Sequence, residues 1–537
     1  MHCCTRPSTS TSIGGAGSSS RWFPPDVSQS KLHNIDYVSL EGARRLVLAL
    51  VAGLTAVRLV TAALAGLGDV EAYYWTWSQN LALGYLDHGP LVAWLIRLGR
   101  WIAGETALAV RLPFVLISAA TLLLVDHLAR RLAPDCARGG LWSVLLVMAM
   151  PMFFVAGAAA NPDVPYMLLV LLFVWALLRL QESPPAHRAR WVVIGALLGG
   201  AACCAKFFGV LLAVPLLAAT WRFTRRPALL ALASGVMILG SAPVLWWNAT
   251  SGWPSLLYHF GARHTQPIGP SVDNVAKLLG GQLGYVQPLV LVALGAVAVQ
   301  LWRRRASATA WLLLLCAAPL LVGGTLLILL VPGAEPHWPA AGYLPLAIAA
   351  GPALVGWRGR SLTRRLCTVG LALSLIAACA IHVHVLTDLG VRLMPAGYVP
   401  RYDLSNELVG WPRVASAVDD AVAKRGQRPT VAAACHYTSC SQLAFAARGR
   451  FEVLCPSPRL DQFDLQPGGD GSARRGVDLL YVRDERFPFE ADQIYRCRTT
   501  RAVERILIRR AGRVVRRFEL QRCVAFAGLR AQTWPPP

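Results

Sequence analysis

The sequence predicts a mostly α, polytopic membrane protein of about 11 transmembrane helices, with a small α/β domain at its C-terminal end outside the cytoplasm. Of the 537 residues, 55% are hydrophobic and 15% are charged, whereas about 25% of a soluble protein is charged. Apolar stretches near the length that a bilayer requires recur from residue 46 to residue 386. Short arginine clusters separate many of them.

The net charge of +23 does not indicate a nucleic-acid partner. Nucleic-acid binding would require the basic residues to form one patch or stripe. Here they fall in short clusters between apolar stretches, which is the positive-inside pattern of membrane proteins.

Residues 1–40 are rich in Ser, Thr, Gly and Pro and have no apolar period. This composition predicts a disordered tail on the cytoplasmic side.

A unit of transmembrane helices follows over 41–389, and its spans are predicted from apolar length. They are 46–67, 108–129, 141–159, 164–180, 190–205, 207–221, 228–247, 281–301, 310–331, 339–356 and 366–386. Residues 91–103 are apolar but are interrupted by Arg97 and Arg100, which favours a helix lying in the membrane interface.

Charge sets the predicted orientation. Arg44 and Arg45 precede the first span, and the arginine clusters in the later connections all fall on the same side under this span count. The N-terminus is therefore predicted to be cytoplasmic. The loops 68–107 and 248–280 and the region 390–537 then lie on the outer side.

The loop after the first span carries two carboxylates, Asp69 and Glu71, among several Tyr and Trp residues. Aromatic side chains with a polar edge suit the membrane–water boundary. Either carboxylate could act as a base on an acceptor hydroxyl. The alternative is structural, because Asp69 is also a good N-cap for the helix that follows.

Two more ionisable residues lie at predicted span ends. Asp163, in the turn Asn161-Pro162-Asp163, is a candidate catalytic residue or an N-cap. Lys206 is the one lysine of the apolar region and could bind a phosphate or extend to the interface.

The remaining candidates are basic. Arg263 and His264 could grip a phosphate, since arginine suits bidentate phosphate contacts, or could touch lipid headgroups. His337 stands beside Glu335 and Trp338. His337 is a candidate to bind the substrate or its phosphate, and it could also ligate a metal together with a carboxylate. The HExxH spacing typical of such metal sites is missing, so the sequence predicts no cofactor with certainty and leaves a divalent metal only possible.

The C-terminal region 390–537 is richer in charge and turn residues, and it predicts a small α/β domain. Val477–Val482, Arg505–Arg509 and Val431–Ala434 are predicted strands. Five of the thirteen cysteines lie here: Cys435, Cys440, Cys455, Cys497 and Cys523. An outer location predicts disulfides with at least one free cysteine.

Several motifs in order resemble the family 39 glycosyltransferases, which include protein O-mannosyltransferases and lipid A aminoarabinose transferases. The resemblance covers roughly residues 45 to 485. Its motifs are 71–75 (EAYYW), 84–91 (GYLDHGPL), 110–113 (VRLP), 161–163 (NPD), 206–208 (KFF), 243–248 (PVLWWN), 280–285 (GGQLGY), 336–339 (PHWP), 442–445 (QLAF) and 461–464 (DQFD).

The resemblance implies a GT-C type fold in a bacterial inner membrane, with the active site at the periplasmic face. It implies a polyprenyl-phosphate sugar donor, inversion at the anomeric carbon, and a lipid, glycan or protein acceptor. It also brings in Asp87, His88 and Arg111 as substrate- or phosphate-binding candidates. Cations such as Lys206 and Arg263 would stabilise the charge that develops on the departing phosphate.

One departure from the family pattern concerns the base. The loop of the family usually reads Asp-Glu-Ala, but here Val70 occupies the aspartate position and Asp69 stands one residue earlier. Asp69 could move in, Glu71 could serve alone, or a phosphate acceptor could need no base. Gly89 also replaces a frequent proline, which predicts a looser turn.

Two other classes of function remain as alternatives. A lipid-sugar transporter would carry charged or broken spans and related halves. A non-catalytic assembly protein would use the aromatic loop as a docking surface.

Overall fold

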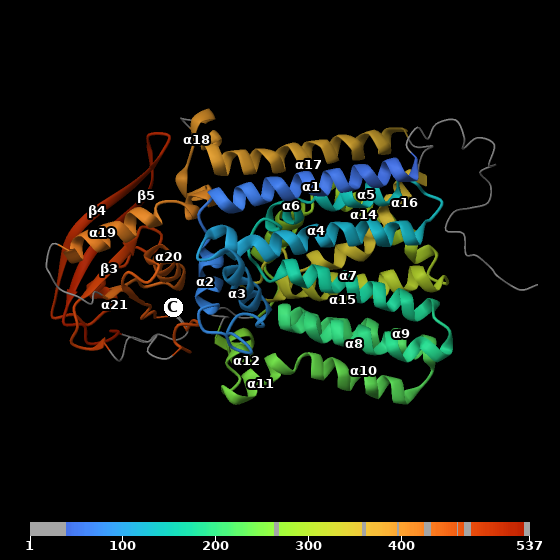
Figure 1. Ribbon diagram of the computed structural model, residues 1–537, viewed down its shortest axis with the longest axis horizontal. Helices are drawn as coiled ribbons and strands as arrows, with labels where there is room; N and C mark the ends of the chain where they lie inside the picture. The colour runs from blue at the N-terminus through green and yellow to red at the C-terminus, as the bar shows by residue number, and fades with distance from the viewer. Residues whose placement is uncertain are drawn as a thin grey trace, which may run out of the picture.

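The computed structural model describes residues 39–262, 268–356, 361–394, 397–423, 431–458, 460–466 and 474–530. A helical bundle with a small sheet domain at one end makes up this part of the chain (Figure 1). The mostly helical class and the C-terminal α/β domain are confirmed. The predicted tail over 1–40 lies outside the described residues except for its last two.

Every predicted span has a helical counterpart, but not all of these helices are long. Among the described residues, seven are long and apolar enough to cross a membrane. Their bounds are Leu40–Leu64 (α1), Ala107–Leu132 (α4), Asp163–Glu182 (α7), Pro185–Ala205 (with α8 from Arg188), Phe207–Thr224 (with α9 from Ala213), Ala308–Leu330 (α15) and Thr368–Thr387 (in α17, Ser361–Thr387).

The predicted count of about 11 spans differs from this total because hydropathy does not report where a helix breaks. The total rises to nine if two bent pairs are each one span. These pairs are Pro227–Gly240 (α10) with Ala242–Thr250 (α11), bent by 61°, and Val272–Tyr285 (α13) with Pro288–Arg303 (α14), bent by 96°.

The other two predicted spans are short helices. Residues 141–159 form Gly139–Met148 (α5) and Pro151–Ala156 (α6), because Pro151 starts a new helix rather than continuing the first. Residues 339–356 form a 3₁₀ turn, Ala340–Tyr343, and the helix Leu344–Gly356 (α16).

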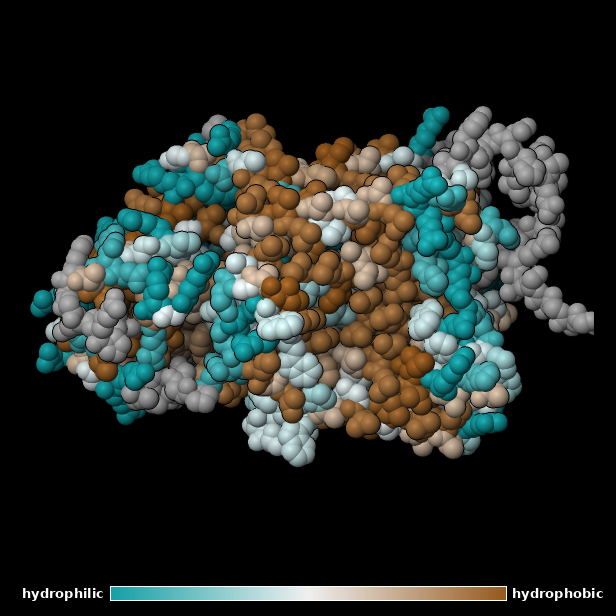
Figure 2. Space-filling view, viewed as in Figure 1, coloured by the Kyte–Doolittle hydropathy of each residue, from teal (hydrophilic) through white to brown (hydrophobic). Residues whose placement is uncertain are grey.

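The two ends of the bundle differ, as the arginine pattern predicts. The connections α4–α5, α7–α8 and α9–α10 lie at one end, and the C-terminal domain lies at the other (Figure 1). An apolar belt separates the polar ends in the space-filling view (Figure 2). Which end faces the cytoplasm stays a prediction.

Short helices lie between the bundle and the C-terminal domain (Figure 1). They are Asp69–Trp77 (α2), Leu91–Ala103 (α3) and Pro254–Leu257 (α12), the last continued by a π-helical turn, Tyr258–Ala262. The helix α3 has the predicted bounds of the interfacial helix. Its Arg100 pairs with Glu105 at 2.5 Å, and the helix packs along α4.

The C-terminal domain holds a five-stranded sheet in the order β2-β1-β3-β5-β4. β1 is parallel to β2 and β3, and β5 is antiparallel to β3 and β4. The strands are Val431–Ala433 (β1), Glu452–Leu454 (β2), Leu479–Asp484 (β3), Thr499–Arg510 (β4) and Arg513–Val524 (β5). The helices are Leu389–Leu393 (α18), Trp411–Ala423 (α19), Tyr437–Ala447 (α20) and Ala491–Ile494 (α21), with 3₁₀ turns at Pro400–Tyr402 and Leu404–Leu408.

The three predicted strands are confirmed as β1, β3 and part of β4. The disulfide prediction is confirmed too. Cys440 is bonded to Cys455 and Cys497 to Cys523, which leaves Cys435 free and buried.

Candidate active site

A cavity of about 1610 Å³ lies where the bundle meets the short helices and the C-terminal domain. Most of its wall is apolar, contributed by the segment after α8, by α9, α10 and α11, and by residues near Pro151. Its polar lining residues include Asp87, His88, Asn161, Asp163, Lys206, Asn248, His259, Glu335, His337 and Tyr437. The same cavity therefore has an apolar wall and a cluster of acidic and basic side chains.

Asp163, Lys206 and His337 form the centre of that cluster. The Lys206 ammonium lies 2.6 Å from Asp163 Oδ1, and His337 Nε2 lies 3.5 Å from Asp163 Oδ2. α8 ends at Ala205, and the extended backbone of Lys206 (φ −151°, ψ 136°) ends the helical run there. The sequence indicated the three residues separately, and the fold brings them together.

The N-cap alternative for Asp163 is wrong. Pro162 is the N-cap residue, and the Asn161 side chain accepts a hydrogen bond from the Val164 N–H at 3.2 Å. The Asp163 carboxylate instead accepts a hydrogen bond from Lys206 and lines the cavity, so it does not cap the helix.

Asp87 and His88 lie in the loop between α2 and α3 and also line the cavity. The Tyr73 hydroxyl lies 3.4 Å from Asp87 Oδ2, and His259 Nε2 lies 3.2 Å from the Asp87 carbonyl oxygen. The His88 ring meets that of Tyr74 edge-on, with centroids 5.8 Å apart. The loop thus presents an acid and an imidazole side by side.

The turn after His88 is not loose, contrary to the expectation from the missing proline. A Cβ at Gly89 would lie 2.2 Å from the Cys204 carbonyl oxygen. Glycine is therefore required because the loop packs directly on the main chain at the end of α8.

Glu71 and Arg111 form a buried ion pair that does not line the cavity. Arg111 Nε donates to Glu71 Oε1 at 2.8 Å and Nη2 to Oε2 at 2.5 Å. Arg111 also donates to the carbonyls of Ala65 and Gly66, at 2.9 and 2.6 Å. Both side chains are only 5–7% exposed.

Glu71, not Asp69, caps α2. Glu71 Oε2 accepts the N–H of Gly68 at 2.8 Å, and Oε1 accepts that of Ala160 at the same distance. The N-cap role expected for Asp69 is therefore wrong, because Gly68 holds the N-cap position and Asp69 is the first helical residue.

Asp69 faces the C-terminal domain. Its Oδ2 lies 2.5 Å from Arg486 Nη1, and its Oδ1 accepts from Gln442 Nε2 at 3.1 Å. Arg486 also pairs with Asp484, which pairs in turn with Arg516. Burial raises the pKa of Asp484, but the two arginines outweigh it and hold that pKa below its ordinary value.

The assignments of Asp69 and Glu71 as bases stay predictions. Val70 lies between them and does line the cavity. The cavity itself offers other carboxylates, among them Asp87 and Asp163.

The basic candidates also divide into residues that line the cavity and residues that do not. Lys206, His88 and His337 line the cavity. Arg111 is engaged by Glu71 and main-chain carbonyls. Arg263 and His264 lie outside the described residues.

Four residues at the site were not singled out from the sequence: Tyr73, His259, Tyr437 and Gln462. Tyr437 and Gln462 belong to the C-terminal domain and meet the loop only through tertiary packing. The motifs 71–75 and 461–464, which contain Tyr73 and Gln462, were the signals in the sequence that pointed to these two residues. Among the described residues, no group of three or more His, Cys, Asp or Glu side chains is arranged to hold a metal ion.

Comparison with known proteins supports the resemblance. Residues 87–247 match the family model of dolichyl-phosphate-mannose-protein mannosyltransferases. The lipid A galacturonosyltransferase RgtD of Rhizobium johnstonii is 26% identical over 345 residues, which cover 63% of this chain and 71% of the relative.

Two solved structures share the fold. They are ArnT from Cupriavidus metallidurans in the apo state (TM-score 0.61, 18% identity) and bound to undecaprenyl phosphate (TM-score 0.60, 16% identity). In each case the match covers 90% of this chain and 98% of the other. The chain has an ArnT-like, GT-C type membrane fold and resembles the glycosyltransferases that modify lipid A.

Proposed function

We propose that this chain transfers a sugar from a polyprenyl-phosphate donor to an acceptor in the cell envelope, with inversion at the anomeric carbon. The observation that carries the proposal is that one cavity has both an extended apolar lining and a charged end. A polyprenyl-phosphate sugar likewise has a long apolar chain and a charged phosphate. The undecaprenyl phosphate bound to the ArnT relative supports such a donor, and the similarity to a lipid A transferase favours a lipid acceptor.

The polyprenyl chain would lie along the apolar lining. This lining is built from Met152, Phe207, Phe208, Leu211, Leu216, Met237, Val244 and Leu245, among others. Burial of each methylene of the lipid contributes about 0.8 kcal/mol, so an apolar wall of this extent favours a long chain over a soluble sugar nucleotide.

The donor phosphate would lie at Lys206, with His88 and His337 beside it. Cleavage of the glycosyl phosphate leaves negative charge on the departing lipid phosphate, and a fixed ammonium stabilises that charge most strongly in a site shielded from water. Asp163 would hold Lys206 in place through their 2.6 Å contact.

Asp87 would assist the acceptor. It lies beside Tyr73, and Tyr437 of the C-terminal domain also lines the cavity. A carboxylate there can accept a proton from an attacking hydroxyl, on the opposite face of the sugar from the leaving phosphate. A phosphate acceptor would need no such help, and the test below separates the two cases.

Asp69 and Glu71 would shape the loop rather than transfer protons. Glu71, paired with Arg111, fixes the start of α2 through the Gly68 N–H, and Asp69 joins that helix to the C-terminal domain through Arg486.

The proposed location is a bacterial inner membrane, with residues 41–389 spanning it and residues 390–537 in the periplasm. The two disulfides of the C-terminal domain support this orientation, because disulfides persist in oxidising compartments. The arginine-rich connections at the opposite end would then be cytoplasmic.

The test measures transfer from a panel of radiolabelled polyprenyl-phosphate sugars into lipid extracts, in membranes containing the wild type or a variant. Lys206→Met should lower kcat by about 10²- to 10³-fold, as removal of one preorganised donor does. Lys277→Met is the matched control, since Lys277 is exposed on α13 and does not line the cavity.

The carboxylate variants identify the base. Loss of transfer in Asp87→Asn, with activity kept in Asp69→Asn and Glu71→Gln, supports the proposal. Full activity in all three indicates an acceptor that needs no base. Absence of product from every donor with folded wild-type protein would overturn the proposed transfer and favour a non-catalytic assembly role.

A further inference from the structure

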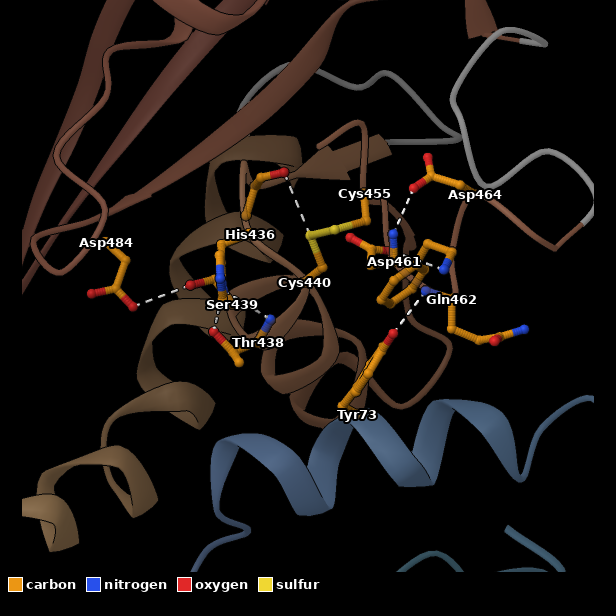
Figure 3. The surroundings of a disulfide bond; sticks show 12 residues. Tyr73, His436, Thr438, Ser439, Cys440, Cys455, Asp461, Gln462, Asp464 and Asp484 are labelled. Atoms are coloured by element: carbon orange, nitrogen blue, oxygen red, sulfur yellow. Dashed lines mark hydrogen bonds between the residues drawn. A yellow bond between two sulfur atoms is a disulfide. The ribbon is translucent and has the colours of Figure 1, made fainter. Parts of the chain in front are cut away.

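A turn of the C-terminal domain, Asp461–Asp464, lies against Tyr73 of α2 (Figure 3) and contacts the loop that carries Asp87 through Leu86. The turn is built to be rigid. The Asp461 N–H donates to Asp464 Oδ2 and the Phe463 N–H to Asp461 Oδ1, each at 2.8 Å. The Cys440–Cys455 disulfide lies close by and ties α20 to the segment that leads to this turn.

Gln462, at the tip of the turn, makes one hydrogen bond with this loop and one with Tyr73 of α2. Its side-chain oxygen accepts the N–H of Leu86 at 2.8 Å, directly before Asp87 in the chain. Its own N–H donates to the Tyr73 hydroxyl oxygen at 2.7 Å. Gln462 is 4% exposed and Leu86 is fully buried, so both bonds are shielded from water.

The hydrogen bond from the Gln462 main-chain N–H to the Tyr73 oxygen affects which acceptor the Tyr73 proton can reach. A phenol has one proton to donate, and its oxygen already accepts from Gln462. The proton is thereby left to the Asp87 carboxylate, 3.4 Å away. Burial, and next the charges of Asp87 and Asp461, raise the pKa of Tyr73 well above its ordinary value, so the hydroxyl stays protonated.

We propose that Gln462 is a positioning residue for transfer: it fixes Asp87 through the Leu86 main chain and through the Tyr73 hydroxyl. The inference rests on the proposed function, in which Asp87 assists the acceptor. The active site is then complete only when the C-terminal domain is docked. That makes the domain part of the catalytic unit.

The test compares Tyr73→Phe and Gln462→Met with the wild type in the transfer assay between pH 4 and 9. Gln462→Met removes the side-chain acceptor of the Leu86 N–H but keeps the main-chain N–H that donates to Tyr73, so it should lower kcat without moving the pH profile. Tyr73→Phe removes the hydrogen-bond donor to the charged Asp87 carboxylate, so the acidic limb of its pH–rate profile should move to higher pH, by about one unit for one hydrogen bond to a carboxylate. The other titratable groups here are Tyr437, Asp461, His88 and His259, and both variants retain them. kcat should fall about 10-fold with the donor KM unchanged.

Tyr85→Phe is the matched control. Tyr85 is a buried phenol of the same loop region, but its hydroxyl contacts only main-chain groups, accepting from Ala82 and donating to Trp77. This variant should lose some thermal stability and keep the wild-type pH profile.

The possible failures are distinct. A wild-type pH profile in Tyr73→Phe, or a wild-type kcat in Gln462→Met, with transfer lost in Asp87→Asn, overturns the inference and leaves the proposed function standing. An equal shift in Tyr85→Phe also overturns it, because the effect would then come from loop packing. Absence of transfer by the wild type overturns the proposed function itself. If Gln462→Met does not fold, Tyr73→Phe decides alone.

Discussion

The buried pair between Glu71 and Arg111 gives the sharpest test of the loop. In Arg111→Met the Glu71 carboxylate stays buried and keeps only its two main-chain donors, the N–H groups of Gly68 and Ala160. Removal of one partner of a buried ion pair costs about 3–5 kcal/mol. We therefore expect Arg111→Met to lower the free energy of unfolding by that amount.

Glu71→Gln should cost less, about 1–3 kcal/mol. The amide keeps the shape of the side chain, and Arg111 retains the carbonyls of Ala62, Ala65 and Gly66 as acceptors. Because the two side chains contact each other directly, the double variant should cost less than the sum of the single variants.

The assay is unfolding by graded SDS in mixed micelles, followed by tryptophan fluorescence, with transfer measured on the same samples. Arg45→Met is the control, because Arg45 and Glu41 are also 2.5 Å apart but are 76% and 73% exposed. It should change stability by less than about 0.5 kcal/mol.

Two results would refute this reasoning. An unfolding curve of Arg111→Met that matches the wild type would show that the pair does not hold the loop. Loss of transfer in Glu71→Gln at wild-type stability would show that Glu71 acts in the chemistry and not in the fold.

Three further predictions concern the loop and the C-terminal domain. Gly89→Ala should lower both transfer and melting temperature, since its Cβ would meet the Cys204 carbonyl oxygen at 2.2 Å; Gly235→Ala, where a Cβ would meet no atom within 4 Å, separates that clash from a general effect of adding a methyl. The double variant Cys440→Ala/Cys455→Ala should lower transfer more than Cys497→Ala/Cys523→Ala does, because the first disulfide precedes the turn that holds Gln462; an equal loss in both would assign the effect to domain stability alone. Asp484 has a folded-state pKa below its unfolded value of about 3.9, so its contribution to stability is present above that pH and lost as the pH falls through the folded value; melting of Asp484→Asn should therefore depend less on pH below about 4 than that of the wild type, and parallel curves would contradict it.

The sequence by itself determined the membrane class, the places of the helices and the C-terminal α/β domain. Apolar length and arginine spacing are local properties of the chain, and a bilayer imposes them on any sequence that spans it. The predicted range of α3 and three of the predicted strands also agree with the structure, because the residue patterns that predict them are local as well. Helix breaks at Pro151 and at the bent pairs were not predicted, because hydropathy averages across them.

Only the tertiary structure decided what each ionisable residue contacts. Asp69 and Glu71 are two residues apart in the chain, yet one pairs with Arg486 of the C-terminal domain and the other with Arg111 of α4. Asp163 and Lys206 are 43 positions apart and lie 2.6 Å from each other. A carboxylate is a base, a cap or half of an ion pair according to the groups that the fold places around it, and those groups come from distant parts of the chain.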